Sequence, residues 1–132
     1  MRLELWMLLS ASLLGLVHIA AASFTFKAQV GNRYTVGARD ENLQPSGTAG
    51  RMFRAQQNFM ETYPIFAVCV VLTHLTDSYG IFSLSGSILY LFGRTLFLPL
   101  YAIGVPWLRT ISWNIATLGL VLVGAQILLA HP

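Results

Sequence analysis

The chain has 132 residues, which is enough for one domain. Apolar residues make up 55% of it and charged residues only 10%, against about 25% charged residues in an ordinary soluble domain, so the chain cannot cover itself with a charged surface. Its net charge of +3 does not indicate nucleic-acid binding, because the basic groups are few and lie beside apolar runs, as they do in membrane proteins.

The first of four apolar segments is residues 5–26, LWMLLSASLLGLVHIAAASFTF, with 22 residues and no formal charge. As a helix it would be about 33 Å long, which is enough to cross a hydrocarbon core of about 30 Å. The sequence HIAAAS within it resembles a signal-peptidase site. Glu4 and the length of the apolar stretch argue against cleavage, so we expect this helix to be retained.

Three further helices are expected from the apolar pattern, at about residues 50–76, 79–104 and 108–130. From Gln57 onward the first of these is interrupted only by Glu61, and the next is interrupted only by Arg94. The polar segment 27–49 contains proline, glycine and serine and is predicted to be a loop. The chain is therefore predicted to be a single domain of residues 1–132, an all-α integral membrane four-helix bundle.

Lysine and arginine residues are distributed unequally between the two ends of such a bundle. Only Arg2 lies at one end, whereas the other end carries Lys27, Arg33, Arg39, Arg51, Arg54 and Arg109. Because basic loops stay in the cytoplasm, we predict a multi-pass protein with the loop in the cytoplasm and both termini outside it. The short chain and the C-terminal sequence LLAHP, which has no retrieval signal, favour a bacterial inner membrane.

A line of polar side chains runs along the start of the second predicted helix. At 100° per residue, one sector of about 80° holds Arg51, Arg54, Asn58 and Glu61. The same arithmetic places on one face of the third helix Tyr90, Arg94, Phe97 and Tyr101. Insertion scales assign about 3 kcal/mol to a charged side chain at the centre of a membrane helix, so we expect Glu61 and Arg94 to form an ion pair.

Guanidinium groups, a carboxylate, an amide and a phenol at one depth would suit a polar, mostly anionic small molecule. Arginines would bind its carboxylates in a bidentate manner and Glu61 would bind its ammonium group, so a peptide fits this description. A purely structural interpretation also exists for each residue. Under it, the two helices carry topology anchors (Arg51, Arg54), an internal ion pair (Glu61, Arg94), an interhelical hydrogen-bonding amide (Asn58) and an interfacial tyrosine (Tyr101).

No other catalytic or metal-binding pattern is present: the sequence lacks HExxH, CxxC, GxSxG and Walker A motifs. The single cysteine, Cys69, excludes an intramolecular disulfide and a cysteine metal cluster, and we interpret it as a small buried apolar residue. His18, His74 and His131 are scattered along the chain, so no metal is expected.

Two segments resemble the membrane-associated proteins in eicosanoid and glutathione metabolism, the MAPEG family. RAQQNFMETYPIF, residues 54–66, is similar to the family signature Arg-Ala-x-x-Asn-x-x-Glu followed by an aromatic residue, proline and an apolar run. GRTLFLPLYAIGVPWLR, residues 93–109, resembles a second block with Gly-Arg, a tyrosine seven residues on and an arginine at the next turn. The resemblance covers roughly residues 5–130.

The resemblance implies a homotrimer of four-helix subunits with glutathione bound between neighbours near the cytoplasmic face. By position, the residues that would bind glutathione are Arg54, Asn58 and Glu61, with Arg51 as a further candidate. Tyr101 would line the site, Arg94 would brace it through Glu61, and Arg109 would lie beside the thiol.

The chain departs from the family pattern at three places. Phe97 stands where other members have tyrosine or histidine, and Thr62 stands where some have tyrosine. The basic end of the first helix is reduced to Lys27 and Arg33. These departures predict weaker glutathione binding or altered chemistry.

We therefore hypothesise a glutathione-dependent transferase or peroxidase for hydrophobic electrophiles that arrive through the lipid, with Arg109 and Tyr101 favouring the thiolate. One alternative is a non-catalytic membrane protein whose polar residues hold a trimer in register. Another is a small transporter or channel subunit, with Pro99 and Pro106 bending the third helix, although broken-helix pairs and repeated halves are absent from the sequence.

Overall fold

The computed structural model describes residues 1–132 and is built from helices alone. Four helices are long: α1 (Leu3–Val30), α3 (Gly47–Leu75), α4 (Ile81–Ala102) and α5 (Pro106–Ala130). The fifth, α2 (Asn32–Val36), has only five residues. Each long helix has the length and apolar composition needed to cross a membrane. The predicted all-α four-helix membrane fold is thereby confirmed.

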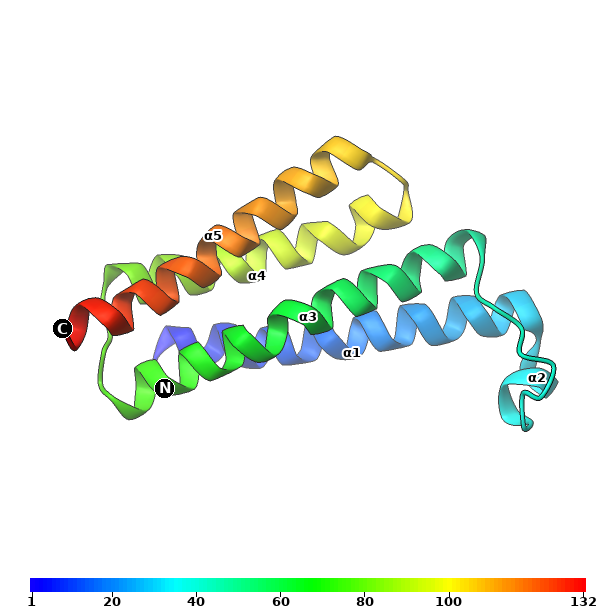
Figure 1. Cartoon of the computed structure of the whole chain (residues 1–132), viewed down its shortest axis with the longest axis horizontal. Coiled ribbons are helices and arrows are strands. Elements are labelled where there is room, and N and C mark those ends of the chain that lie inside the picture. The colour runs from blue at the N-terminus through cyan, green and yellow to red at the C-terminus, as the bar shows by residue number, and fades with distance from the viewer.

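The long helices are arranged as two neighbouring pairs, α1 with α3 and α4 with α5 (Figure 1). Both termini lie at the end of the bundle that also carries the α3–α4 connection, and α2 and the α4–α5 turn lie at the opposite end (Figure 1). Arg2 is thus separated along the bundle from the other basic residues, as the sequence predicted for alternating spans.

The segment between α1 and α3 is more ordered than the predicted loop 27–49. Helix α1 continues to Val30 and ends at Gly31, whose φ of 89° a residue with a side chain rarely adopts. The side chain of Gln29 accepts a hydrogen bond from Ser46 N at 2.9 Å and donates one to Gln44 O at 3.0 Å. These bonds tie the end of the loop back to α1 and fix where α3 begins.

The two prolines expected to bend the third helix occupy different helices. Pro99 lies within α4, whereas Pro106 is the first residue of α5. At that first position proline costs no hydrogen bond, because the helix has no acceptor for the missing N–H.

Helices α4 and α5 approach each other closely because glycines face the contact. A β-carbon at Gly119 would lie 2.5 Å from the carbonyl oxygen of Gly86, and one at Gly93 would lie 2.6 Å from that of Ser112. Small residues allow this backbone approach between membrane helices, where dispersion contacts rather than the hydrophobic effect drive association.

Polar side chains join the remaining helices. A hydrogen bond of 2.6 Å links Ser12 of α1 to the hydroxyl of Tyr63 of α3. At the terminal end, Ser83 of α4 donates to the buried carboxylate of Glu4 at 2.8 Å. Such bonds between membrane helices contribute about 0.6 to 2 kcal/mol each.

The α4–α5 contact generates a prediction with an internal control. Gly119→Ala should lower the stability of the detergent-solubilised protein by about 1 to 3 kcal/mol, because the new methyl group meets backbone that cannot move away easily. Gly124→Ala, on the same helix with open space around it, should be neutral or slightly stabilising. Thermal unfolding followed by circular dichroism compares the two. Equal midpoints would show that the close approach does not limit stability.

Candidate functional site

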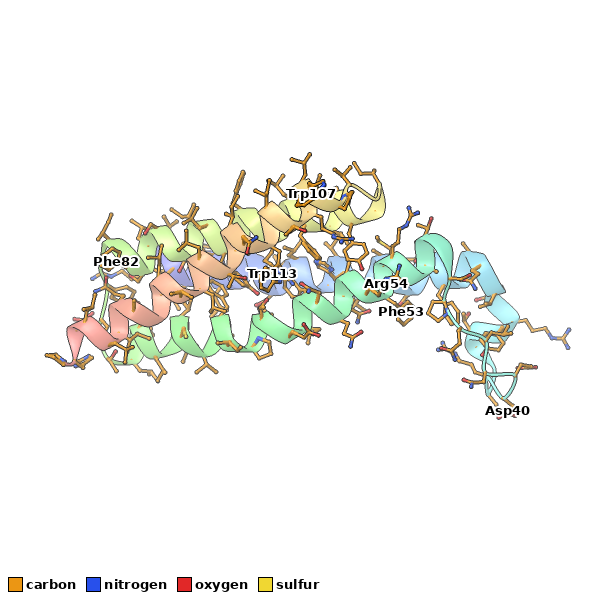
Figure 2. All side chains as sticks on the ribbon, turned by 45° about the horizontal axis from the view of Figure 1, so that its top comes forward. Asp40, Phe53, Arg54, Phe82, Trp107 and Trp113 are labelled. Atoms are coloured by element: carbon orange, nitrogen blue, oxygen red, sulfur yellow. The ribbon has the colours of Figure 1, made fainter.

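A pocket of about 240 Å³ opens between α3, α4 and α5. Its walls are formed by Asn58, Phe97, Tyr101, Arg109, Thr110 and Trp113. Four of these six residues were already named in the sequence analysis: Asn58, Phe97, Tyr101 and Arg109. The end of the bundle that carries α2 and the loop after it is called the loop-bearing end. Trp113 of α5 lies further from this end than Arg54 of α3 does (Figure 2).

Tyr101 is held by two arginines. The Nε of Arg54 donates a hydrogen bond to the Tyr101 hydroxyl at 3.1 Å. The guanidinium carbon of Arg109 lies 4.6 Å from the centre of the Tyr101 ring, and that of Arg54 lies 5.9 Å from it. Since the phenol oxygen accepts from Arg54, its own hydrogen remains free to be donated to another group.

Asn58 is oriented by Arg94. Nη1 of Arg94 donates to Oδ1 of Asn58 at 2.8 Å. A guanidinium can only donate, so the amide oxygen must face Arg94 and the amide nitrogen keeps its two hydrogens for other partners. Because Asn58 lines the pocket, this side chain presents a hydrogen-bond donor there.

The guanidinium of Arg94 is enclosed by aromatic rings. Arg94 is only 1% exposed, and its guanidinium carbon lies 5.3 Å from the ring centre of Phe59 and 4.9 Å from that of Phe97. Nε and Nη2 have no hydrogen-bond partner. The cation is therefore contacted by ring faces and by Asn58, and no carboxylate forms a salt bridge with it.

The ion pair expected between Glu61 and Arg94 is absent within the chain. Glu61 is exposed and has no hydrogen-bonded partner, whereas Arg94 bonds to Asn58. Asn58 and Glu61 are three residues apart, so their side chains point about 60° apart around α3. Of these two residues, only Asn58 forms a hydrogen bond to α4, through Arg94.

Two other sequence candidates lie beside the pocket rather than in it. Arg51 is exposed and donates from Nη1 to the carbonyl oxygen of Ala102 at 3.1 Å, which joins the start of α3 to the end of α4. Tyr90 is fully buried in the core: its ring stacks on Phe66 at 4.0 Å, and a hydrogen bond of 3.1 Å joins its hydroxyl to Thr62.

Sequence reasoning missed two residues of the pocket, Thr110 and Trp113. They follow Arg109 at the next position and one turn later on α5, so the helical spacing from Arg109 could have identified Trp113. The Thr110 hydroxyl donates to the carbonyl oxygen of Pro106 at 2.9 Å, which leaves it as an acceptor on the pocket side. Trp113 is half-buried and adds apolar area to the wall.

The groups around the pocket divide into a polar part and an apolar part. The polar part consists mainly of donors, from Asn58, Tyr101 and Arg109, and no carboxylate is among the lining residues. The apolar part is made by the rings of Phe97 and Trp113. Such a pocket suits an anionic group held next to an apolar molecule.

Comparison with known proteins identifies one family. The model of the MAPEG family matches residues 3–129, which include all four long helices. No curated protein and no solved structure matches the chain significantly.

The bond between Arg94 and Asn58 generates a prediction about stability. Asn58→Leu removes the only hydrogen-bond acceptor of a buried guanidinium, so we expect a loss of about 3 to 5 kcal/mol. Gln57→Leu changes a neighbouring exposed amide that makes no side-chain hydrogen bond, and should change stability by less than about 0.5 kcal/mol. Denaturant unfolding in detergent measures both. Similar losses in the two variants would contradict the role given to Asn58.

Proposed function

Because the chain belongs to the MAPEG family, whose model covers nearly all of it, we propose that this membrane protein binds glutathione in the pocket between α3, α4 and α5. The proposed activity is that of a glutathione-dependent transferase or peroxidase acting on hydrophobic electrophiles. Glutathione is a co-substrate in this proposal, and no metal is involved.

The observation that carries the proposal is the direction of the hydrogen bonds around the pocket. Arg94 occupies the oxygen of Asn58, and Arg54 occupies a lone pair of the Tyr101 oxygen. Both side chains are thereby left with hydrogens to donate, beside the guanidinium of Arg109. A free thiol has a pKa of about 8.5, so at neutral pH it needs such donors to be mostly thiolate.

The ends of glutathione would be bound by groups near the mouth of the pocket. Arg51 and Arg54 are exposed at the start of α3 and have free N–H groups for carboxylates. Glu61, which has no partner within the chain, would bind the ammonium group. In this assignment Arg94 acts as a positioning residue through Asn58.

Arg109 and Tyr101 would act on the sulfur. As the thiol loses its proton to water, Arg109 supplies a permanent positive charge and Tyr101 donates its hydroxyl hydrogen to the sulfur. The sulfur electron pair then forms a bond to the electrophilic carbon, and the leaving group departs with the bonding pair. With a hydroperoxide, the sulfur attacks one oxygen and the O–O bond breaks, which gives the sulfenic acid of glutathione and an alkoxide that takes a proton from water. A second glutathione then displaces water to give the disulfide.

The apolar substrate would enter from the lipid. The rings of Phe97 and Trp113 form the apolar part of the pocket wall. Trp113 lies deeper than Arg54 along the bundle (Figure 2). A molecule dissolved in the bilayer would therefore meet the sulfur without passing through water.

The proposal includes a homotrimer with the loop-bearing end in the cytoplasm and both termini outside it. Glu61 is exposed on a helix that crosses the membrane, where contact with hydrocarbon would be unfavourable. A neighbouring subunit would cover it. The excess of lysine and arginine at the loop-bearing end supports the orientation.

A non-catalytic role is the second candidate, and one observation favours it. Arg54, Tyr101 and Arg109 already form a connected network without a ligand. In that case these residues would hold helices or subunits together and nothing would be bound.

The thiolate role of Arg109 is testable without knowing the electrophile. Arg109→Ala should keep glutathione binding within a few-fold, while the thiolate fraction falls by up to about tenfold for each unit by which the pKa of the bound thiol rises. Ultraviolet absorbance of the thiolate, measured on purified protein at neutral pH, reports this directly. Arg2→Ala, a change of an exposed arginine at the opposite end of the bundle, is the control and should behave like the wild type. An unchanged thiolate signal in Arg109→Ala would reject the assignment.

The two candidate functions differ in their response to glutathione. If the protein binds it, a concentration 100 times the dissociation constant should stabilise the wild type by about 2.7 kcal/mol, seen as a higher melting temperature. Glu61→Gln should reduce that shift. The non-catalytic alternative instead predicts no shift for the wild type and a loss of the oligomer in Glu61→Gln, which size-exclusion chromatography with light scattering would detect.

A further inference from the structure

A second cavity, of about 200 Å³, lies at the loop-bearing end of the bundle. The end of α1, the short helix α2 with the residues after it, and the start of α3 enclose it. Its walls carry two cationic side chains, Lys27 and Arg39, and two hydroxyl groups, those of Ser23 and Thr35. The remaining walls are three phenylalanine rings. None of these residues lines the pocket proposed to bind glutathione.

Neither of the two cationic side chains of this cavity forms a salt bridge within the chain. No carboxylate lines the cavity, and Lys27 makes no side-chain hydrogen bond or salt bridge. Arg39 donates from Nε and Nη2 to the carbonyl oxygen of Thr35, at 3.2 and 2.9 Å, which fixes the guanidinium and leaves Nη1 free. The adjoining cavity on the other side of Arg39 differs, because Asp40 and Glu41 line it.

The length of α1 gives an expected depth for this cavity, near the lipid headgroups. Helix α1 has 28 residues and is about 42 Å long, which exceeds a hydrocarbon core of about 30 Å. Lys27 is in its last turn. Phe53 of α3 lies at the same end of the bundle, with Asp40 at the tip of the loop beyond it (Figure 2).

The phenylalanine rings give the cavity an apolar side that continues into the membrane. Phe26 is buried and packs edge-on against Phe53, with ring centres 5.7 Å apart, and so forms the floor. Phe24 is 68% exposed and precedes Lys27 by less than one turn of α1. An acyl chain leaving the cavity would follow this ring.

We propose that this cavity binds an anionic phospholipid, with its phosphate between Lys27 and Arg39 and an acyl chain along Phe24. The hydroxyl of Ser23 would donate to a phosphate oxygen. Basic cavities between membrane helices at the headgroup level are suited to this ligand, because the phosphate replaces the missing counter-charge and the apolar wall keeps the chains in lipid. The proposal is independent of the activity proposed above.

The test uses the full chain in a neutral detergent, titrated with phosphatidylglycerol, phosphatidylcholine or inorganic phosphate, with bound lipid counted by native mass spectrometry. Phosphatidylglycerol should be retained and should raise the melting temperature more than the other two. Lys27→Gln and Arg39→Gln should each weaken its binding roughly fivefold. Arg33→Gln removes the same charge from α2, at the same end of the bundle, without touching this cavity, and should change binding by less than about twofold.

Three results would overturn the proposal. The first is equal weakening by Arg33→Gln and Lys27→Gln, which would mean general charge attraction. The second is equal binding of phosphatidylcholine. The third is an equal effect of inorganic phosphate, which would assign the cavity to a free anion. Lys27→Gln changes an exposed side chain without hydrogen bonds, so it should fold normally. Lys27→Arg, which keeps the charge, should restore binding.

Discussion

The burial of Arg94 is the constraint on which the inner face of the bundle depends. A guanidinium that is 1% exposed inside a membrane protein needs compensation, and the chain supplies it from three residues. Asn58 accepts one hydrogen bond, and Phe59 and Phe97 place their ring faces against the cation. Two of these residues are on α3 and one is on α4 with Arg94, so this charge fixes the relative rotation of the two helices.

The same constraint sets the polarity of the candidate site. With its oxygen engaged by Arg94, Asn58 offers only donors to the pocket, and Arg54 has the corresponding effect on Tyr101. Helix α5 then completes the wall, because the glycine contact with α4 brings Arg109 and its helix close to Tyr101. A structural cation, two oriented side chains and a close helix contact together give one pocket lined mainly by hydrogen-bond donors.

The first turns of α3 connect this pocket to the cavity at the membrane surface. Phe53 lines that cavity, and its neighbour Arg54 holds Tyr101. The Gln29 side chain, which bonds to Ser46 and Gln44, fixes the segment from which α3 starts. A ligand bound in that cavity would therefore contact the same end of α3 that positions the candidate site.

The sequence by itself determined the class of fold, the four spans and most of the residues that line the candidate site, because apolar length and helical spacing are local properties of the chain. It placed Arg54, Asn58, Tyr101 and Arg109 within reach of one another, and it identified the family. Only the tertiary structure decided which partner each polar group takes. Arg94 bonds to Asn58 instead of Glu61, Tyr90 turns into the core, and Trp113 joins the pocket. These outcomes depend on the rotation and separation of neighbouring helices, which glycine contacts and ring packing between distant segments set and which no local pattern encodes.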